Sequence, residues 1–339
     1  MLFIGNLTLT SPLVLAPMAG ISDLPYRMIN RSFGCGLAFT EMISATALAY
    51  KSANTLRMLS THPDDRPLGV QIMGREPELI KRALDNISGL AFDMIDFNAA
   101  CPVRKVASKG RGAGLLQEPL VLQKLLRLIV GYTDLPVTVK IRSGWDETSI
   151  NAVDTAVRAQ DAGVKGLVIH GRTRKQMYCG EVDYDIIRKV KETLSIPVIA
   201  SGDALTPALI KKMFDETGCD GVAVARGALG NPWIFRQTTG HLTSGAVPSG
   251  PGIDEIAQAM KQHLNLIVEF LGERVGIIHF RKFFAWYIRG MSVKEMKARA
   301  FVACTQEEML RLIEELHTRH RASALTQGHD VDPYRVVAP

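Results

Sequence analysis

A cysteine stands where a strand-like run of the sequence ends, in a setting that suggests chemistry. The run MIDF (94–97) is followed by Asn98, two alanines and Cys101, and the cations Arg104 and Lys105 come just after a proline. A thiol at such a place either packs as a small apolar side chain or reacts. A reactive thiol in its protonated form, with a pKa of about 8.5, donates a proton, whereas neighbouring cations favour the nucleophilic thiolate. The flanking residues alone leave all three roles open.

Other strand-like runs also end in residues that contact ligands in many enzymes. These residues are Pro17, Met18 and Ala19, Glu41, Gln71, Lys140 and Arg142, His170 and Arg172, Ser201, Gly202 and Asp203, and Ala225, Arg226 and Gly227. Packing alone does not explain so many polar and ionisable groups at the same place in successive runs. We therefore expect one binding site at which these strand ends converge.

Short β-branched runs alternate with helical stretches along the first two thirds of the chain. The expected strands are 13–17, 37–42, 68–74, 94–100, 137–142, 166–171, 197–202 and 221–226. The expected helices include 77–90, 119–131, 149–162, 184–194 and 206–217, with Ser149 and Thr206 as N-caps. Eight such repeats predict an α/β fold, a (β/α)8 TIM barrel, with its active site at the carboxyl ends of the strands. No G-x-G-x-x-G motif follows the first strand, which disfavours an open dinucleotide-binding sheet.

The remaining chain has a different pattern. We expect the barrel to occupy residues 1–240, and a Gly-, Pro- and Ser-rich linker to occupy 241–253. Residues 254–319 have the apolar spacing of a small helical bundle. Residues 320–339 show little periodicity, so we expect a flexible tail there.

Composition restricts the class of protein. The chain has 339 residues, of which 47% are hydrophobic and 22% charged, as in globular proteins. It has no apolar run of the roughly 18 residues that a membrane span requires, and its N-terminus lacks the features of a signal peptide. The five cysteines are scattered and form no CxxC pair, so neither a disulfide framework nor a metal site is indicated. We expect a cytoplasmic, monomeric protein with reduced thiols.

The loops after the last two barrel strands suggest a phosphate site. Phosphates in barrel enzymes often bind backbone N–H groups after strands 7 and 8. The segments SGDAL (201–205) and ARGALGNPWIF (225–235) supply glycines for close approach and Arg226 for a phosphate oxygen, although each glycine alone would suit an ordinary turn. Lys140 and Gln71 could reach the polar edge of a cofactor ring whose phosphate binds these loops. This arrangement favours flavin mononucleotide (FMN). The principal alternative is that Lys140 forms a Schiff base, as in barrel aldolases.

Part of the chain's net charge of +6 is concentrated in residues 274–299. The cations there are Arg274, Arg281, Lys282, Arg289, Lys294, Lys297 and Arg299, interleaved with Phe280, Phe283, Phe284, Trp286 and Tyr287. A cluster of cations with a single acid favours a polyanionic partner. The alternative is an ordinary solvated helix whose aromatic rings face the core.

Several motifs together resemble one enzyme family. They are APMAGISDLPYR (16–27), VQIMG (70–74), IDFNAACPVRKV (95–106), VTVKIRSGW (137–145), VIHGRTRKQMYCGEVDY (168–184), VIASGD (198–203) and ARGALGNPWIF (225–235). Over roughly residues 3–320 the chain resembles the tRNA-dihydrouridine synthases, and most of all the bacterial B-type group. The resemblance implies a flavin-binding barrel followed by a helical RNA-binding domain. It also implies reduction of selected tRNA uridines to 5,6-dihydrouridine, with NADPH (or NADH) as reductant and FMN as cofactor.

The resemblance also assigns roles to residues. It places Pro17, Met18, Ala19, Gln71, Lys140, His170, Ser201, Gly202, Asp203, Ala225 and Arg226 at flavin-contacting positions. It places Cys101 at the catalytic acid, so that the thiol protonates C5 of uracil while hydride reaches C6. Asn98 is expected to bind or orient the uracil. For tRNA phosphates we expect Arg104, Lys105, Arg172, Arg174, Arg281, Lys282 and Arg289, with a surface ion pair as the alternative for Arg172 and Arg174.

Two other functions remain compatible with the sequence. A small-molecule flavin oxidoreductase of the dihydroorotate dehydrogenase type would use the same barrel but would have no use for residues 254–317. An RNA-binding module with a vestigial barrel would keep the helices but would not bind FMN. The target base of a tRNA enzyme must leave the RNA fold to enter a barrel mouth.

Overall fold

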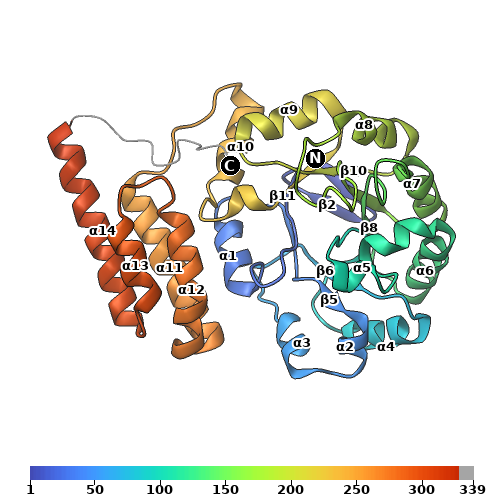
Figure 1. Cartoon of the computed structure of the whole chain (residues 1–339), viewed down its shortest axis with the longest axis horizontal. Coiled ribbons are helices and arrows are strands. Elements are labelled where there is room, and N and C mark those ends of the chain that lie inside the picture. The colour runs from blue at the N-terminus through green and yellow to red at the C-terminus, as the bar shows by residue number, and fades with distance from the viewer. Residues whose placement is uncertain (328–339) are drawn as a thin grey trace.

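The computed structural model describes residues 1–327 of the chain (Figure 1). Within these residues, eight parallel strands form the barrel: β3 (Leu13–Leu15), β4 (Leu37–Phe39), β6 (Leu68–Met73), β7 (Met94–Asn98), β8 (Val137–Arg142), β9 (Gly166–His170), β10 (Val198–Ser201) and β11 (Gly221–Val224). Each pairs with its neighbour in chain order, β11 pairs with β3, and pairing of β4 with β6 closes the ring. The predicted TIM barrel is confirmed. The second strand is shorter than expected, and a separate short strand, β5 (Ile43–Ser44), pairs with β6.

Helices surround the barrel, and the five helices that the sequence predicts are all present among them. The helices around the barrel are α1 (Leu24–Ser32), α2 (Ala45–Ala49), α3 (Ala53–Met58), α4 (Pro77–Ile87), α5 (Arg104–Ala107), α6 (Pro119–Tyr132), α7 (Ala152–Asp161), α8 (Tyr184–Thr193), α9 (Pro207–Thr217) and α10 (Ile234–Ser244), with 3-10 turns η1 (Gly112–Gln117) and η2 (Arg226–Ala228). Thr206 caps α9, since its hydroxyl accepts the backbone N–H of Leu209 at 3.2 Å. The predicted cap at Ser149 is wrong, because α7 begins three residues later and the Ser149 hydroxyl donates to Asp146 instead.

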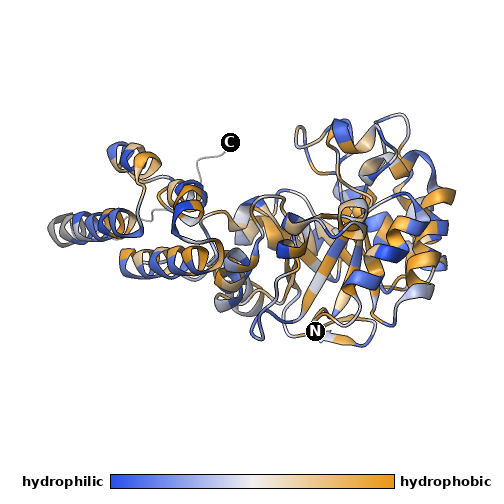
Figure 2. Ribbon diagram, turned by 90° about the horizontal axis from the view of Figure 1, so that it is seen from below, coloured by the Kyte–Doolittle hydropathy of each residue, from blue (hydrophilic) through white to orange (hydrophobic). Residues whose placement is uncertain are grey.

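The barrel interior changes from apolar at one end to polar at the other. A hairpin of β1 (Leu2–Ile4) and β2 (Leu7–Leu9) lies across the amino ends of the strands (Figure 2), and its buried side chains pack with Val168 and Ile199 inside the barrel. Farther along the same inward faces stand buried polar residues such as Gln71 and Asp96. The apolar end stabilises the barrel, so the polar residues are confined to the carboxyl end, where barrel enzymes bind ligands.

One glycine allows a large side chain to fill the apolar end. A Cβ at Gly69 would lie 2.4 Å from the ring of Phe39, which is itself 3% exposed inside the barrel. Any side chain at position 69 would therefore displace that ring from the core.

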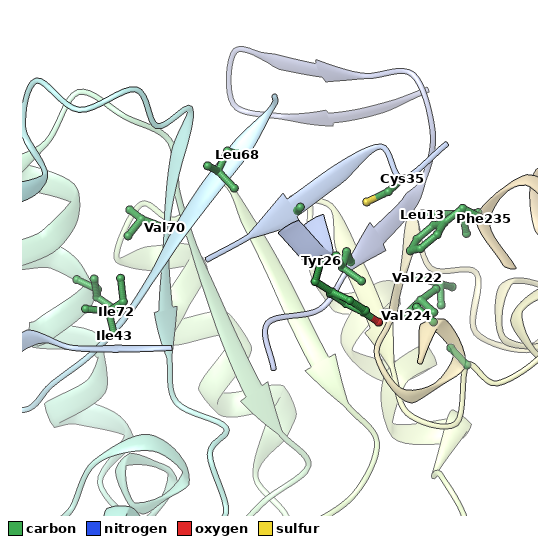
Figure 3. Packing of buried hydrophobic residues seen from close by; sticks show 14 of the residues in the cluster. Leu13, Tyr26, Cys35, Ile43, Leu68, Val70, Ile72, Val222, Val224 and Phe235 are labelled. Atoms are coloured by element: carbon green, nitrogen blue, oxygen red, sulfur yellow. The ribbon is translucent and has the colours of Figure 1, made fainter. Parts of the chain in front are cut away.

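The main hydrophobic core lies between the strands and the surrounding helices. The outward-facing residues of the strands pack against apolar residues of the helices, as Figure 3 shows for Leu13, Val70, Ile72, Val222 and Val224. Because strand side chains alternate, the same strands place one set of residues in this core and the other set inside the barrel.

A helical domain follows the barrel and lies to one side of it (Figure 1). It consists of α11 (Ile253–Leu271), α12 (Glu273–Tyr287), α13 (Lys294–Val302) and α14 (Gln306–Gln327). The connection to the barrel is shorter than the predicted linker, because residues 241–244 still belong to α10. Helix α14 continues to Gln327, past residue 320 where we expected a flexible tail to begin, and residues 328–339 lie outside the described part.

Aromatic rings join the helical domain to the barrel. Tyr26 of α1 stacks on Phe283 of α12 at 5.6 Å between ring centres, and His263 of α11 lies 4.5 Å from the same ring. His263 and Tyr287 also form a hydrogen bond of 3.2 Å. Since these four side chains are buried, the aromatic residues of α12 belong largely to a core that the barrel and the helices share.

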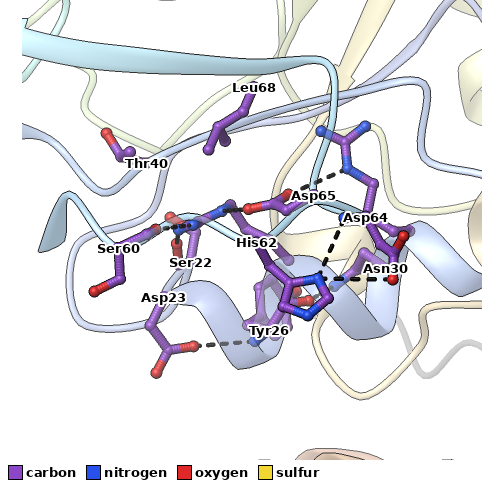
Figure 4. A network of polar contacts seen from close by, with 12 residues as sticks. Ser22, Asp23, Tyr26, Asn30, Thr40, Ser60, His62, Asp64, Asp65 and Leu68 are labelled. Carbon is purple, nitrogen blue, oxygen red and sulfur yellow. Dashed lines mark hydrogen bonds and ion pairs between the residues drawn. The ribbon is translucent and has the colours of Figure 1, made fainter. Parts of the chain in front are cut away.

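A buried ion pair fixes α1, the helix at this junction. The guanidinium of Arg27 donates to Asp65 at 2.7 Å, and the two side chains are 1% and 0% exposed. Arg31 donates to the other oxygen of the same carboxylate at 3.3 Å. Figure 4 shows this network, in which Asp23 caps the start of the helix by accepting the N–H of Tyr26.

We predict that Asp65→Ala lowers the free energy of unfolding by about 3–5 kcal/mol, because it leaves a buried guanidinium without its counter-charge. Chemical denaturation followed by circular dichroism measures the change. Asp154→Ala, which breaks an exposed pair with Arg158, is the control and leaves the midpoint almost unchanged. Equal midpoints for the two variants would show that the Asp65 pair does not stabilise the junction.

Candidate active site

A pocket of about 550 Å³ opens at the carboxyl ends of the barrel strands. It is lined by every residue predicted to contact the flavin: Pro17, Met18, Ala19, Gln71, Lys140, His170, Ser201, Gly202, Asp203, Ala225 and Arg226. Asn98 and Cys101 line it as well. The strand ends therefore converge as the sequence predicted. The roles of these residues are a separate question.

A buried carboxylate below the pocket orients the polar side chains above it. Asp96, 1% exposed, accepts hydrogen bonds from Thr138 Oγ1 and from Gln71 Nε2, both at 2.7 Å. Burial raises the pKa of this carboxyl group, while the hydrogen bonds from Thr138 and Gln71 and the charge of Lys140 act in the opposite direction. Gln71 turns its amide nitrogen toward Asp96. The amide oxygen of Gln71 then faces Asn98 and accepts from Asn98 Nδ2 at 2.9 Å.

Asn98 passes this orientation to the cysteine. With its nitrogen directed at Gln71, its Oδ1 accepts the backbone N–H groups of Ala100 at 3.1 Å and Cys101 at 2.9 Å. The amide thus closes the turn that carries the thiol into the pocket. Asn98 was predicted to bind uracil, and the structure gives its side chain these contacts with the protein.

The Cys101 thiol is only partly buried, yet its surroundings keep it protonated. Burial raises the pKa of the thiol above its ordinary value, and the nearby Arg142 offsets only part of that increase. The Arg142 guanidinium donates hydrogen bonds to three backbone carbonyls, those of Ala100 at 2.8 Å, Thr173 at 3.0 Å and Met177 at 2.8 Å. A protonated thiol at this place suits a general acid better than a nucleophile.

Lys140 is the group in the pocket that most clearly requires a ligand. Its Nζ is buried and has no hydrogen-bond partner within residues 1–327. Burial lowers the pKa of this ammonium to about 8, although the carboxylate of Asp96 counteracts the effect. A buried ammonium without a partner is costly, so an acceptor supplied by a ligand would stabilise it.

His170 lies on the neighbouring strand and is neutral. Burial, reinforced by the surrounding cations Arg142, Lys140, Arg172 and Arg226, lowers its pKa to about 2. The imidazole therefore offers one donor and one acceptor at any working pH.

The loops after β10 and β11 form the predicted phosphate side of the pocket. Gly202 and Gly227 are required there, because a Cβ would lie 2.8 Å from Val182 in the first case and 2.1 Å from the Ala204 carbonyl in the second. Asp203 has a left-handed backbone with a φ of 47° and accepts from Arg226 Nη2 at 2.6 Å. This pairing holds Arg226 at the rim of the pocket.

Arg172, for which we predicted a contact with a tRNA phosphate, is buried and paired inside the protein. It is 2% exposed and forms a two-pronged pair with Asp203, one bond of which is 3.1 Å long, and it also donates to the Gly180 carbonyl at 2.6 Å. Arg172 comes two residues after the end of β9, and the loop that follows folds over its side chain. The ion pair named as the alternative is present, but it is buried.

Reasoning from the sequence missed Asp96 and Tyr178. Asp96 stands two residues before Asn98 on one strand face, so alternation could have placed it under the site. Tyr178 lines the pocket, with its ring 5.7 Å from the Arg142 guanidinium and 5.3 Å from that of Arg226. It lies in an irregular loop, where no periodicity marks a functional residue.

The predicted tRNA contacts divide into exposed and internal residues. Arg104 and Lys105 of α5 are exposed, as is Arg289 after α12. Arg281 donates to the Ala303 carbonyl at 2.7 Å, a contact inside the helical domain. This bond ties α12 to the end of α13, and the phosphate contact of Arg281 stays a prediction.

Lys282 connects the helical domain to the barrel mouth. Its ammonium donates to the Gly20 carbonyl, while the Gly20 N–H donates to Glu41. Burial lowers the pKa of Lys282 and raises that of Glu41. Gly20 directly follows Pro17, Met18 and Ala19, so α12 holds the loop that lines the pocket.

The closed parallel barrel and the convergence of ionisable groups at its carboxyl mouth define a TIM-barrel enzyme. The histamine dehydrogenase from Rhizobium sp. 4-9 has the same fold, with a TM-score of 0.59 at 11% identity over 99% of this chain and 66% of that one. The old yellow enzyme homologue from Zymomonas mobilis aligns with a TM-score of 0.54 at 11% identity over 75% of this chain and 94% of that one. At such identities the likeness concerns the fold alone.

Sequence comparison identifies the family. The profile of the Dihydrouridine synthase (Dus) family matches residues 14–322. The tRNA-dihydrouridine synthase B of Pasteurella multocida is 38% identical over 312 residues, 91% of this chain and 94% of that protein. The probable tRNA-dihydrouridine synthase of Rickettsia conorii is 38% identical over 292 residues, 86% and 88% of the two chains. This chain belongs to the dihydrouridine synthase family.

We predict that Asn98→Leu loosens the Cys101 turn, because two backbone N–H groups lose their acceptor. The expected loss of stability is about 2 kcal/mol. Alkylation of Cys101 by iodoacetamide, followed by mass spectrometry, is expected to accelerate in this variant. Asn98→Asp keeps an acceptor for both N–H groups but loses the donor to Gln71, so its alkylation rate is expected to lie between those of the parent and Asn98→Leu. Parent-like alkylation in Asn98→Leu would show that the side chain does not fix the turn.

Proposed function

We propose that the chain is an FMN-dependent tRNA-dihydrouridine synthase that reduces the C5–C6 double bond of tRNA uridines with NADPH. A flavin and a tRNA substrate are what membership of the family implies. The observation that carries the finer proposal is the presence in one pocket of a buried, unpartnered ammonium, Lys140, and a protonated thiol, Cys101. One is suited to holding a polar ring edge, and the other to donating a proton.

The residues of the pocket fit a flavin mononucleotide. Lys140 and Gln71 would hold the polar edge of the ring, and the small residues of 17–19 would lie along its face. Gly202, Gly227 and Arg226 would hold the phosphate, for which the arginine can exchange its contact with Asp203. When bound there, a reduced flavin supplies the hydride, chemistry that belongs to the cofactor.

Cys101 completes the reaction with a proton. The hydride that reaches C6 leaves charge to be neutralised at C5, and the thiol donates its proton to that atom. Asn98 fixes the turn from which the thiol points, and Arg142 holds the preceding carbonyl, so the acid is positioned before substrate arrives. The raised pKa of the thiol keeps the proton available at neutral pH.

The helical domain offers a surface for the RNA. A hollow of about 810 Å³ lies along α12 and α13 and is lined by Lys282, Trp286, Arg289, Lys294 and Lys297, with no acidic residue in its lining. We call it the basic hollow. Its cations suit the phosphate backbone, and its aromatic ring suits an unstacked base. Because Lys282 also holds the loop at residue 20, the hollow adjoins the barrel mouth.

The alternatives explain less. A lowered pKa also suits a Schiff-base lysine, so the ammonium alone does not exclude an aldolase, and family membership favours the flavin. A dihydroorotate-type enzyme would leave the basic hollow without a use. A vestigial barrel would not keep a buried ammonium facing a pocket.

A cytoplasmic location follows from the proposed tRNA substrate, and the monomeric state stays a prediction. Within the described residues, every helix is too short or too polar to cross a lipid bilayer.

The proposal predicts that Cys101→Ala separates the two half-reactions. NADPH is expected to reduce the flavin at the parent rate, while dihydrouridine formation in tRNA falls by about 10²–10⁴-fold, the usual effect of losing a positioned acid. Anaerobic stopped-flow absorbance and mass spectrometry of the tRNA measure the two steps. Cys101→Ser, a far weaker acid, is not expected to restore the product. Parent-like product formation by both variants would reduce the thiol to a packing role.

The same thiol predicts a pH dependence. Deprotonation removes the donor, so oxidation of the reduced enzyme by tRNA is expected to stay constant at neutral pH and to decline only above about pH 8.5, because the pKa is raised. Single-turnover rates at several pH values test this. A decline already centred near pH 7 would contradict a protonated resting thiol.

For the basic hollow we predict that replacing Arg289, Lys294 and Lys297 by alanine together weakens tRNA binding. The binding constant falls as salt rises, and each lost phosphate contact is expected to make the slope of log K against log salt less steep by about 0.7–0.9. Lys282→Met is the contrasting variant, because it is expected to weaken FMN retention as well by releasing the loop at Gly20. Unchanged affinity and slope in the triple variant would make the cluster a solvated surface.

A further inference from the structure

A second hollow beside the barrel mouth has no role in the chemistry described above. It has a volume of about 630 Å³ and lies between the α5 segment and the loops that follow β8 and β9. Its lining includes Arg104, Trp145 and Arg174, together with Gln117 and Glu118. We call it the α5 hollow.

Two residues in the lining of the α5 hollow form a stacked pair. The Arg174 guanidinium lies 4.7 Å from the centre of the Trp145 ring. Backbone hydrogen bonds hold the two loops together, from Arg174 N to the Gly144 carbonyl at 2.9 Å and from Lys175 N to the Trp145 carbonyl at 3.0 Å. A guanidinium stacked in this way keeps its planar row of N–H donors available for a phosphate.

Two arginines of the α5 hollow lack partners for their charge. Arg174 Nε is buried without a hydrogen-bond partner in the described part of the chain. The exposed Arg104 guanidinium forms no hydrogen bond or ion pair with any residue in 1–327. Glu118, by contrast, already pairs with Arg75 at 2.7 Å. Within the described residues, the hollow therefore has two arginines without a counter-charge, and its carboxylate, Glu118, is already paired.

The α5 hollow adjoins the active-site pocket. Val103 and Val106 line the pocket, whereas Arg104 and Ala107 line the hollow, so the short α5 segment separates the two. The loop after β9 also reaches both, through Tyr178 in the pocket and Arg174 in the hollow. A ligand with one ring at the flavin and a second half around α5 would occupy both spaces.

The reductant of the proposed reaction is such a ligand. Only the nicotinamide ring of a dinucleotide has to meet the flavin, and a pocket of about 550 Å³ that also holds the flavin leaves the adenosine half outside. The basic hollow, whose lining carries cations and no acid, suits a long phosphate backbone. The α5 hollow combines arginines, an indole, an amide and a carboxylate, a mixed set that suits a single nucleotide.

We propose that the α5 hollow binds the phosphate-bearing adenosine half of the nicotinamide dinucleotide, with Arg174 and Arg104 on its phosphates. The inference rests on the proposed function, from which it takes the reductant. Arg174 and Arg104 then act on reduction of the flavin and not on tRNA binding, which reverses the role predicted for them from the sequence.

The test is anaerobic stopped-flow reduction of the FMN-loaded enzyme by NADPH and by NADH, without tRNA. In Arg174→Ala the NADPH concentration for half-maximal rate is expected to rise about tenfold or more, with the limiting rate at saturation unchanged. Arg104→Ala is expected to give a smaller rise, and because this side chain is exposed, the variant tests the proposal even if Arg174→Ala fails to fold. Arg127→Ala, an exposed arginine of α6, is the control and is expected to behave like the parent.

The outcomes are distinct. A rise for NADPH alone supports a contact with the 2′-phosphate, and a rise for both nucleotides supports a contact with the pyrophosphate. Parent-like half-saturation in both variants overturns the proposal. If a separate tRNA-binding measurement on the same variants then shows lost affinity, the arginines belong to the RNA contact. If neither nucleotide reduces the parent enzyme, the proposed reductant itself is wrong, and the inference fails with it.

Discussion

A single buried carboxylate sets the direction of the hydrogen bonds beneath the active site. Asp96 accepts from the Gln71 amide, the Gln71 oxygen accepts from Asn98, and the remaining oxygen of Asn98 accepts from the backbone of the Cys101 turn. Each amide could be reversed if it stood alone, and the chain of bonds removes that freedom. The position of the thiol is therefore decided by a residue that does not line the pocket. The same carboxylate stabilises the positive charge of Lys140, so the position of the Cys101 thiol and the charge of the ammonium both depend on Asp96.

This arrangement depends on an interior that is apolar at one end and polar at the other. The N-terminal hairpin and rings such as Phe39 fill the amino end, which leaves room for buried polar groups only near the mouth. Buried polar groups destabilise a protein little when each has a hydrogen-bond partner, and most of those below the pocket have one. Within residues 1–327 the Lys140 ammonium, which faces the pocket, has no such partner, and an acceptor from a ligand would stabilise it.

The helical domain supports this arrangement and also carries the surface that we propose for RNA. Tyr26, His263 and Phe283 give the barrel and the helices a common core, and Arg27 with Asp65 fixes the helix on which that core rests. Lys282 then reaches from α12 to the loop that lines the pocket. A tRNA held by α12 and α13 would thus be gripped by the same helix that positions one wall of the active site.

The sequence by itself determined the barrel, the helical domain and the set of residues at the mouth, because the alternation of strands and helices and the residues at strand ends are local patterns. It also determined the family, through long motifs that the comparisons confirm. Only the tertiary structure decided what each charged residue touches. Arg172 pairs with Asp203 of the loop after β10, Arg281 donates to the Ala303 carbonyl, and Asp96 is linked to Asn98 through Gln71 of the neighbouring strand. Such contacts join residues that are distant in the chain, and charge or burial in a folded protein depends on those neighbours more than on the adjacent sequence.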